Sequence, residues 1–233
     1  MYVPPFAPQP IEIPKNVAQE PYLVRLGFIR RVAALHFLSI LIVAAMTLLP
    51  QPPVNTGAAG LVVLLILVLL SLVRGVAKGR DADQKLSSLI LPLLFLALAV
   101  WLRALYEEGW AIWALGVGVA CAAAYIAVCG KDLSFVGMFV LALLASSIVI
   151  AAMGWRLGIG GLHLSAALSL NAGFLFYYVY DLAALLTRRR VREEVGAVAD
   201  LYRDILNGLT YPLRVIHHWR DNNIWAPPKE WFR

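Results

Sequence analysis

The sequence predicts an all-α integral membrane protein, a helical bundle with six apolar spans and a seventh, more polar helical segment. Of its 233 residues, 61% are hydrophobic and 15% are charged, and the mean hydropathy is +0.75. Soluble domains average about half apolar and a quarter charged. The apolar residues also gather in runs of about 20, the length that crosses a bilayer. Lysine and arginine, in turn, concentrate in alternate loops.

Six apolar runs predict six helices, at about 32–50, 57–77, 87–105, 110–129, 132–153 and 159–187. A seventh, more polar segment follows at about 196–216. The loops between the runs are short and contain turn-forming residues, as in Gln51-Pro52-Pro53. Helices joined so tightly are expected to be antiparallel neighbours.

Positive charge sets the expected topology, because lysine and arginine beside a span remain on the cytoplasmic side. Arg30 and Arg31 precede the first span, the next loop is uncharged, and the run Arg188-Arg189-Arg190-Val191-Arg192 follows the sixth. This alternation predicts a cytoplasmic N-terminus. Basic residues follow the seventh segment as well. A seventh crossing would break the rule and a segment that dips in and returns would obey it, and both remain open.

Two tails flank a membrane domain of residues 25–216. Residues 1–24 are rich in proline, which favours an extended cytoplasmic tail without a fold of its own. Residues 217–233 carry three tryptophans and Pro227-Pro228. Such tails suit docking onto membrane-protein partners or a membrane surface. The first residues lack the pattern of a signal peptide, so we expect a retained first helix and a bacterial cytoplasmic (inner) membrane location.

Asp181 is a functional candidate because ionisable side chains at membrane depth are costly and usually face a bundle interior or a water-filled path. It lies in the sixth apolar run, about two turns before Arg188. The structural alternative is that its carboxylate reaches the interface or pairs with one of the arginines that follow.

The seventh segment carries polar side chains at helical spacing. They are Asp200, Asp204, Asn207, Tyr211 and Arg214, which fall on one face of a helix. A polar stripe of this kind fits the centre of a bundle, and the alternative is an amphipathic helix on the membrane surface. Pro212 predicts a kink or an early end.

Two carboxylates in a poorly solvated site cannot both ionise cheaply and tend to share a proton. If Asp181 meets Asp204, the pair would sense pH, and its oxygens could bind a calcium ion. We see no nucleophile, base and metal set, so we expect no enzyme and no cofactor beyond calcium as a bound or transported ion. The basic residues form no single patch, so we expect no nucleic-acid partner.

Four stretches of the chain resemble motifs of the Bax inhibitor-1 (TMBIM) family of membrane proteins, which has small bacterial members. They are Phe28-Ile29-Arg30-Arg31-Val32, Cys129-Gly130-Lys131-Asp132-Leu133-Ser134-Phe135-Val136-Gly137, Tyr180-Asp181-Leu182 and the stretch 201–214. This resemblance implies a bundle of seven transmembrane helices, in which six surround a central, more polar seventh. It also implies a pH-sensitive calcium leak governed by Asp181 and Asp204. The alternative is a structural or regulatory subunit of a larger membrane complex, or a membrane-protease modulator, that keeps this fold.

The chain departs from the family pattern beside both aspartates. Leu182 replaces the usual threonine, and Arg203 stands where the family is apolar. Arg203 could neutralise a neighbouring carboxylate, which puts the pH response in question. In the family an arginine of the second helix can pair with the aspartates, and Arg74 is the candidate for that role here.

Overall fold

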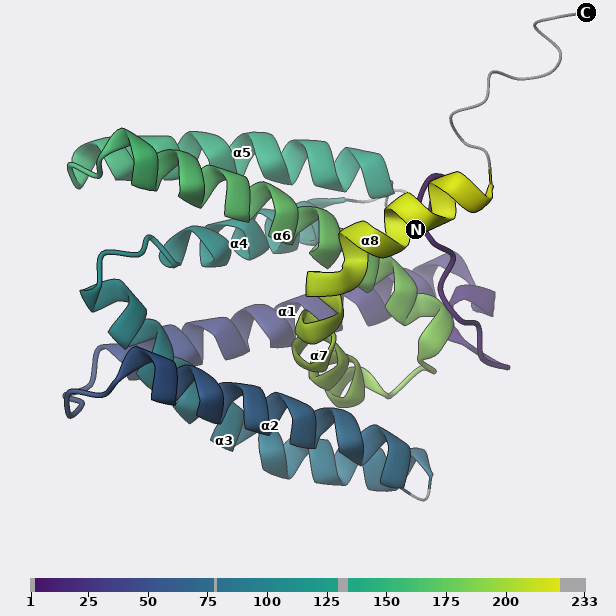
Figure 1. The fold of residues 1–233 in the computed structure, drawn as a ribbon. Helices are drawn as coiled ribbons and strands as arrows, with labels where there is room; N and C mark the ends of the chain where they lie inside the picture. Colours follow the sequence, from purple (N-terminus) through teal and green to yellow (C-terminus); the bar gives the residue numbers. More distant parts are fainter. Residues whose placement is uncertain (1–2, 78, 130–133, 223–233) are drawn as a thin grey trace, which may run out of the picture.

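The computed structural model describes residues 3–77, 79–129 and 134–222. The regular secondary structure of this part is helical (Figure 1). A short 3-10 helix, η1 (Val17–Gln19), is followed by α1 (Tyr22–Thr47), α2 (Thr56–Val76), α3 (Arg80–Glu107), α4 (Trp113–Val128), α5 (Phe135–Arg156), α6 (Gly161–Arg188), α7 (Glu194–Arg203) and α8 (Ile205–Asp221). The helices α1 to α6 follow the six predicted runs, although α1 begins ten residues earlier than predicted.

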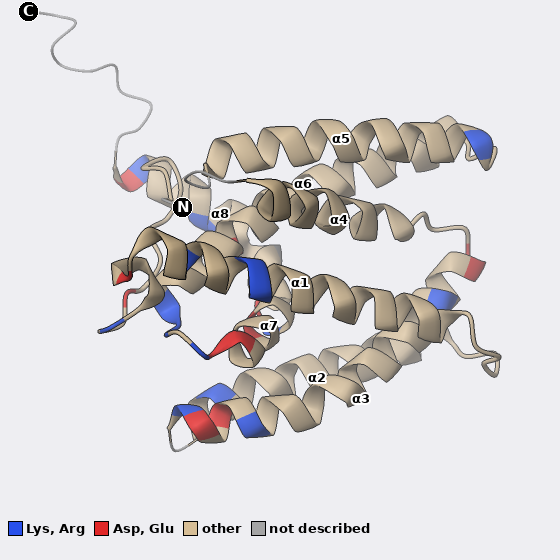
Figure 2. Cartoon of the chain, turned by 180° about the vertical axis from the view of Figure 1, so that it is seen from behind, with Lys and Arg blue, Asp and Glu red and all other residues tan. Residues whose placement is uncertain are grey.

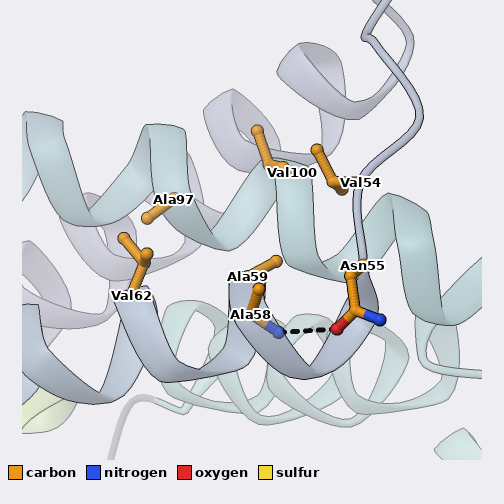
Figure 3. A pocket seen from close by; sticks show the side chains of 7 residues that line it. All are labelled: Val54, Asn55, Ala58, Ala59, Val62, Ala97 and Val100. Atoms are coloured by element: carbon orange, nitrogen blue, oxygen red, sulfur yellow. Dashed lines mark hydrogen bonds between the residues drawn. The ribbon is translucent and has the colours of Figure 1, made fainter.

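Five of these helices, α1, α2, α3, α5 and α6, are long and apolar enough to cross a membrane, and α4 is apolar but shorter. The chain therefore has the make-up of an integral membrane protein. The apolar helices begin at recognisable caps. The Asn55 side chain accepts a hydrogen bond from Ala58 N at the start of α2 (Figure 3), and Ser134 caps α5 in the same way. The cap at Ser134 lies beside residues 130–133 of the predicted motif, which are outside the described residues.

The long helices run antiparallel along the chain, as expected. α2 pairs with α3, and α4 packs with α5 and α6, while α1 lies between these groups and contacts both α3 and α4 (Figure 1). At one end of the bundle α1, α3 and α5 begin and α2, α4 and α6 end. Most of the lysine and arginine residues gather there (Figure 2), and we call it the basic end.

The seventh segment differs from the predicted single helix over 196–216. It divides at Asp204 into α7 and α8, and α8 continues through Pro212 to Asp221. At the start of α7, Glu194 pairs with Arg31 near the beginning of α1. At the end of α8, Trp219 donates to the Phe6 carbonyl, and the Phe6 ring contacts the Phe135 ring at the start of α5. Both ends of the segment therefore lie at the basic end, so it enters the bundle and returns.

α7 is the enclosed part of this hairpin. It contacts α1, α2, α3 and α6, and its residues from Gly196 to Arg203 are buried. α8 is more exposed and packs mainly on α6 and α7. The enclosed polar helix is therefore α7 alone, which has 10 residues. The predicted helix over 196–216 would have been long enough to cross the membrane.

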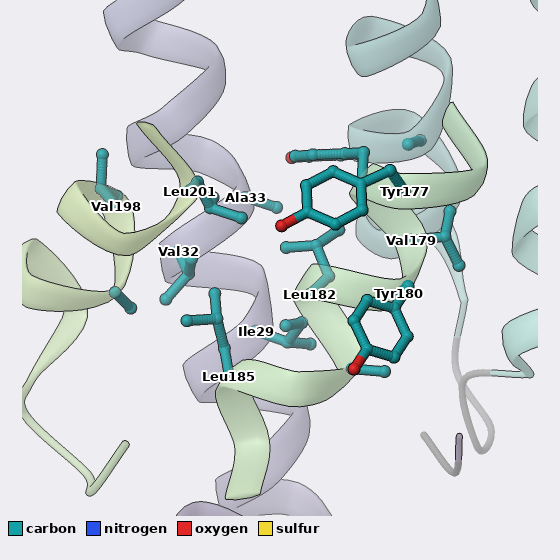
Figure 4. Packing of buried hydrophobic residues seen from close by; sticks show 14 of the residues in the cluster. Ile29, Val32, Ala33, Tyr177, Val179, Tyr180, Leu182, Leu185, Val198 and Leu201 are labelled. Atoms are coloured by element: carbon teal, nitrogen blue, oxygen red, sulfur yellow. The ribbon is translucent and has the colours of Figure 1, made fainter. Parts of the chain in front are cut away.

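The core is densest around the last half of α6, where every residue from Tyr177 to Leu186 is buried. Ile29 and Val32 of α1 lie on one side of it, and Val198 and Leu201 of α7 belong to the same cluster (Figure 4). A helix buried on all sides needs cover at its end as well as along its length. The N-terminal residues provide that cover.

The proline-rich N-terminus is not a free tail. Ile13 N donates to Thr187 O at 3.0 Å and Val17 N donates to Arg189 O at 2.9 Å. The Val17 side chain is fully buried. Residues 3–20, which include turns and η1, therefore form a strap bound across the basic end, because the end of α6 offers it carbonyl groups and apolar surface.

Candidate functional site

Arg188, the last residue of α6, bridges the two predicted aspartates. Its Nη1 atom lies 2.6 Å from Asp204 Oδ2, and its Nη2 atom donates to Asp181 Oδ1. The side chains of Asp181 and Asp204 are 3% and 4% exposed, and that of Arg188 is 15% exposed. The structure thus places both aspartates around one guanidinium group, which also fulfils the alternative that Asp181 pairs with an arginine of the following run.

Three further side chains fix Asp204 and α8. Asn207 Nδ2 donates to Asp204 Oδ1 at 2.8 Å, and the Tyr177 hydroxyl donates to the Asp204 carbonyl at 2.7 Å. Tyr211 packs its ring against Tyr177 at a centroid distance of 5.1 Å. Of the predicted polar stripe, Asn207 therefore contacts Asp204 directly, and Tyr211 packs on Tyr177, which binds the Asp204 carbonyl.

Arg214 is more remote from the aspartates. Its guanidinium carbon lies 5.7 Å from the centroid of the Tyr211 ring, and its Nη2 atom donates to Asn207 O at 3.2 Å. Arg214 is exposed and supports the site through Tyr211 rather than through a carboxylate.

The charge balance of this site leaves one negative charge without a partner, because two carboxylates share one guanidinium. Asp181 Oδ2 is buried and accepts no hydrogen bond from the described residues. An unpartnered buried carboxylate oxygen is costly, and a proton or a cation would relieve it. No group of three or more His, Cys, Asp or Glu residues in the described part is placed to bind a metal ion. A calcium ion bound by Asp181 and Asp204 would have to displace Arg188.

Asp200 belongs to a second buried network beside the first, because the break at Asp204 divides the predicted stripe. Its Oδ2 atom lies 2.5 Å from Arg189 Nε, and its Oδ1 atom lies 3.3 Å from Arg203 Nη1. Both arginines also reach Asp83 on α3, at 3.1 Å from Arg189 and 3.2 Å from Arg203. This network ties α7 to α3 and to the end of α6.

The two predicted ion-pair partners, Arg74 and Arg203, therefore do not reach the aspartate pair. Arg74 Nη1 lies 3.7 Å from Asp200 Oδ1, and Arg203 donates to Ser87 Oγ at 2.8 Å as well as to Asp83. Arg203 precedes Asp204 in sequence, but consecutive helical side chains point in different directions. The arginine that contacts both Asp181 and Asp204 is Arg188 of α6.

The arginines of the second network control the acidity of Asp200. Burial acts to raise the pKa of Asp200, but the hydrogen bond and charge of Arg189, with the charges of Arg74 and Arg203, outweigh burial. The pKa of Asp200 is therefore held below its ordinary value of 3.8, and the carboxylate stays ionised at neutral pH. Gly196 makes room for this contact, since a Cβ atom there would lie 2.7 Å from Arg189 Nη1.

Two features of the site were not predicted as site residues. Asp83 stands in the first turn of α3, between the basic residues Arg80 and Lys85. Arg188 and Arg189 were interpreted only as flanking charge and as possible partners for Asp181. Their position about two helical turns after Asp181, on the same helix, is the available signal for a buried role.

The fold and the site together define a helical membrane protein with a buried network of aspartates and arginines at the basic end of its bundle. Comparison of the chain with protein-family models, with curated proteins and with solved structures gave no match. The resemblance to the Bax inhibitor-1 family therefore stays a prediction that rests on the motifs themselves.

Proposed function

We propose that the protein is a pH-sensitive leak pathway for calcium or another cation, on a variant of the Bax inhibitor-1 fold whose seventh segment is the re-entrant pair α7 and α8. The observation that carries this proposal is the shared guanidinium: Arg188 binds Asp181 within α6 and Asp204 at the junction of α7 and α8. A buried contact between a spanning helix and a hairpin that only enters the bundle is suited to hold a gate shut.

Charge gives the gate its sensitivity. With both carboxylates ionised, the site holds one excess negative charge in a poorly solvated environment, and the nearby Asp200 adds to the repulsion. A bound proton would make the net charge of Asp181, Asp204 and Arg188 zero. The re-entrant pair α7 and α8 would then stay in place. Loss of that proton adds repulsion between α6 and the junction. We therefore expect cation flux to rise as the pH rises.

The membrane position follows from the same charges. The basic end carries the exposed arginines, and positive charge stays on the cytoplasmic side of a membrane. We place the basic end, with the strap and Asp221, on the cytoplasmic side of a bacterial inner membrane. The gate would then control the cytoplasmic mouth of the pathway.

The test is calcium entry into proteoliposomes that contain the whole chain, measured from about pH 5 to pH 8. Flux that depends on pH, together with loss of that dependence in Asp181→Asn and Asp204→Asn, supports the proposal. Asp221→Asn is the matched control, because Asp221 is 61% exposed at the end of α8, and it should behave as the wild type. Absence of cation flux at every pH would overturn the proposal.

The subunit alternative is then the function to pursue. The strap is engaged with its own bundle through Phe6, Ile13 and Val17. A partner would have to displace the strap or bind residues 223–233, which lie outside the described part. Copurification of a stable partner with the whole chain would favour this alternative.

A further inference from the structure

A cavity of about 860 Å³ lies mainly between α1, α3 and α4, and its lining does not include Asp181, Arg188 or Asp204. Arg103 and Glu107, near the end of α3, line its outer mouth, and His36, Tyr202 and Ile205 line its inner end. Most of the remaining wall is aliphatic or aromatic. Its size lies in the range of sites that bind small molecules or lipid chains.

The inner end of the cavity offers few free polar groups. His36 Nδ1 and the Tyr178 hydroxyl are hydrogen-bonded at 3.1 Å, and the hydroxyls of Tyr202 and Ser39 are 2.6 Å apart. Ser39 in turn donates to the His36 carbonyl. These polar atoms satisfy one another, so the inner wall is a poor host for water and a good one for hydrocarbon.

The outer mouth has the opposite chemistry. Arg103 Nε and Glu107 Oε1 form an ion pair at 2.8 Å, and the two side chains are 33% and 58% exposed. Arg103 also donates to Leu49 O at 2.9 Å, which holds it at the end of α1. A mouth with one positive and one negative group matches a headgroup that carries a phosphate and an ammonium.

The cavity opens toward the bilayer as well. Leu41 of α1 and Leu48, the residue directly after α1, line it and are 49% and 82% exposed. They continue the outward apolar surface of the spanning helices, so a lipid can reach the cavity without leaving the membrane.

We infer that this cavity binds one acyl chain of a zwitterionic phospholipid, with the headgroup at Arg103 and Glu107 and the chain end against Ile205. Ile205 directly follows Asp204, so an occupied cavity keeps water away from the junction of α7 and α8 on this side. This consequence for gating rests on the proposed leak function. Lipid binding itself does not, and it is measured separately.

The test uses the whole chain, purified from vesicles of phosphatidylethanolamine and phosphatidylglycerol and examined by native mass spectrometry. The wild type should retain one phosphatidylethanolamine. Gly116→Phe should lose it, because Gly116 lines the cavity and a Cβ atom there meets only Ile40 Cγ2, at 3.8 Å. Gly173→Phe is the matched control, since a Cβ atom at this exposed position meets nothing within 4 Å and lies outside the cavity lining.

Retention by the wild type and the control, with at least tenfold less lipid on Gly116→Phe, supports the site. Equal lipid on all three proteins, or preference for phosphatidylglycerol, would overturn it. If Gly116→Phe does not fold, Ala44→Phe on the α1 wall of the cavity is the second variant. Because retention is scored without any flux measurement, failure of the lipid site and failure of the leak function are separate results.

Discussion

The Nη1 atom of Arg188 lies 2.6 Å from the Oδ2 atom of Asp204, at the residue where α7 ends and α8 begins. Helical hydrogen bonds continue through this residue, from Asp204 N to Asp200 O at 2.8 Å and from Gly208 N to Asp204 O at 3.0 Å. The change of helix direction therefore costs little backbone hydrogen bonding. The side-chain contacts of Asp204 then fix the position of α7 and α8 relative to α6.

Replacing Arg188 tests this relationship. Arg188→Gln leaves two buried carboxylates without their shared cation, and the loss of one partner from a buried ion pair costs about 3 kcal/mol. We expect that decrease in the free energy of unfolding of the detergent-solubilised protein in chemical denaturation. Arg192→Gln, at an exposed position of the same run, should change it little. Equal stability of the two variants would contradict the bridging role.

Asp200 predicts a pH dependence of stability with a definite sign. Its pKa in the folded protein is below the ordinary value of 3.8, so the unfolded chain binds more protons near that value. The stabilisation by Asp200 is present above pH 3.8 and is lost as the pH falls through the folded-state pKa. Asp200→Asn should lower the melting temperature at neutral pH, and the difference from the wild type should shrink below pH 3.8. A constant difference down to the lowest accessible pH would contradict this assignment.

Gly118 sets the distance between α4 and α6. A Cβ atom at this position would lie 2.2 Å from Asn171 Oδ1 and 3.2 Å from Leu175 Cγ. Asn171 cannot move away freely, because its Nδ2 atom donates to Ser146 Oγ on α5 at 2.8 Å. Overpacking of this kind costs about 1–3 kcal/mol, so Gly118→Ala should lower the melting temperature.

Gly116→Ala is the control for that substitution. Position 116 lies two residues earlier on the same helix, and a Cβ atom there makes ordinary contact with Ile40 Cγ2 at 3.8 Å. Its melting temperature should equal or exceed that of the wild type, because alanine favours the helix. A smaller decrease in melting temperature for Gly118→Ala than for Gly116→Ala would contradict the close contact of α4 with α6 at Gly118.

The strap makes a prediction about local opening. Trp219→Phe keeps an aromatic ring but removes the indole N–H that donates to the Phe6 carbonyl. Loss of one such hydrogen bond costs about 1 kcal/mol, so amide exchange of residues 3–17 should become about fivefold faster. Trp155→Phe, at a position 87% exposed near the other end of the bundle, should leave that exchange unchanged. Unchanged exchange in Trp219→Phe would show that the strap is held by other contacts.

The spanning helices were predictable because each one carries its own signal. An apolar run of sufficient length is helical in a membrane whatever its neighbours are, since its backbone groups must bond to one another. The predicted runs therefore match α1 to α6. The early start of α1 was missed because residues 22–31 mix charged and apolar side chains. Residues 22–31 are nevertheless helical, because the helix buries Leu26, Phe28 and Ile29 against the bundle.

The seventh segment shows where this reasoning fails. Spacing placed Asp200 and Asp204 on one face of one helix, and Pro212 suggested where that helix would bend. The structure bends it at Asp204 and carries α8 past Pro212. The bend depends on groups far away in sequence, Tyr177 and Arg188, which bind the Asp204 main chain and side chain. The sequence around Asp204 does not predict these contacts.

The sequence by itself determined that this protein is built from membrane-length helices and that most of its positive charge lies at one end. It also singled out Asp181 and Asp204 as candidate acids within those helices. Only the tertiary structure decided which arginine serves which aspartate and that the last segment returns to the end where it entered. The physical reason is that burial of an apolar run is a local property of composition. The pairing of a buried charge depends instead on which partner the packed helices bring within about 3 Å.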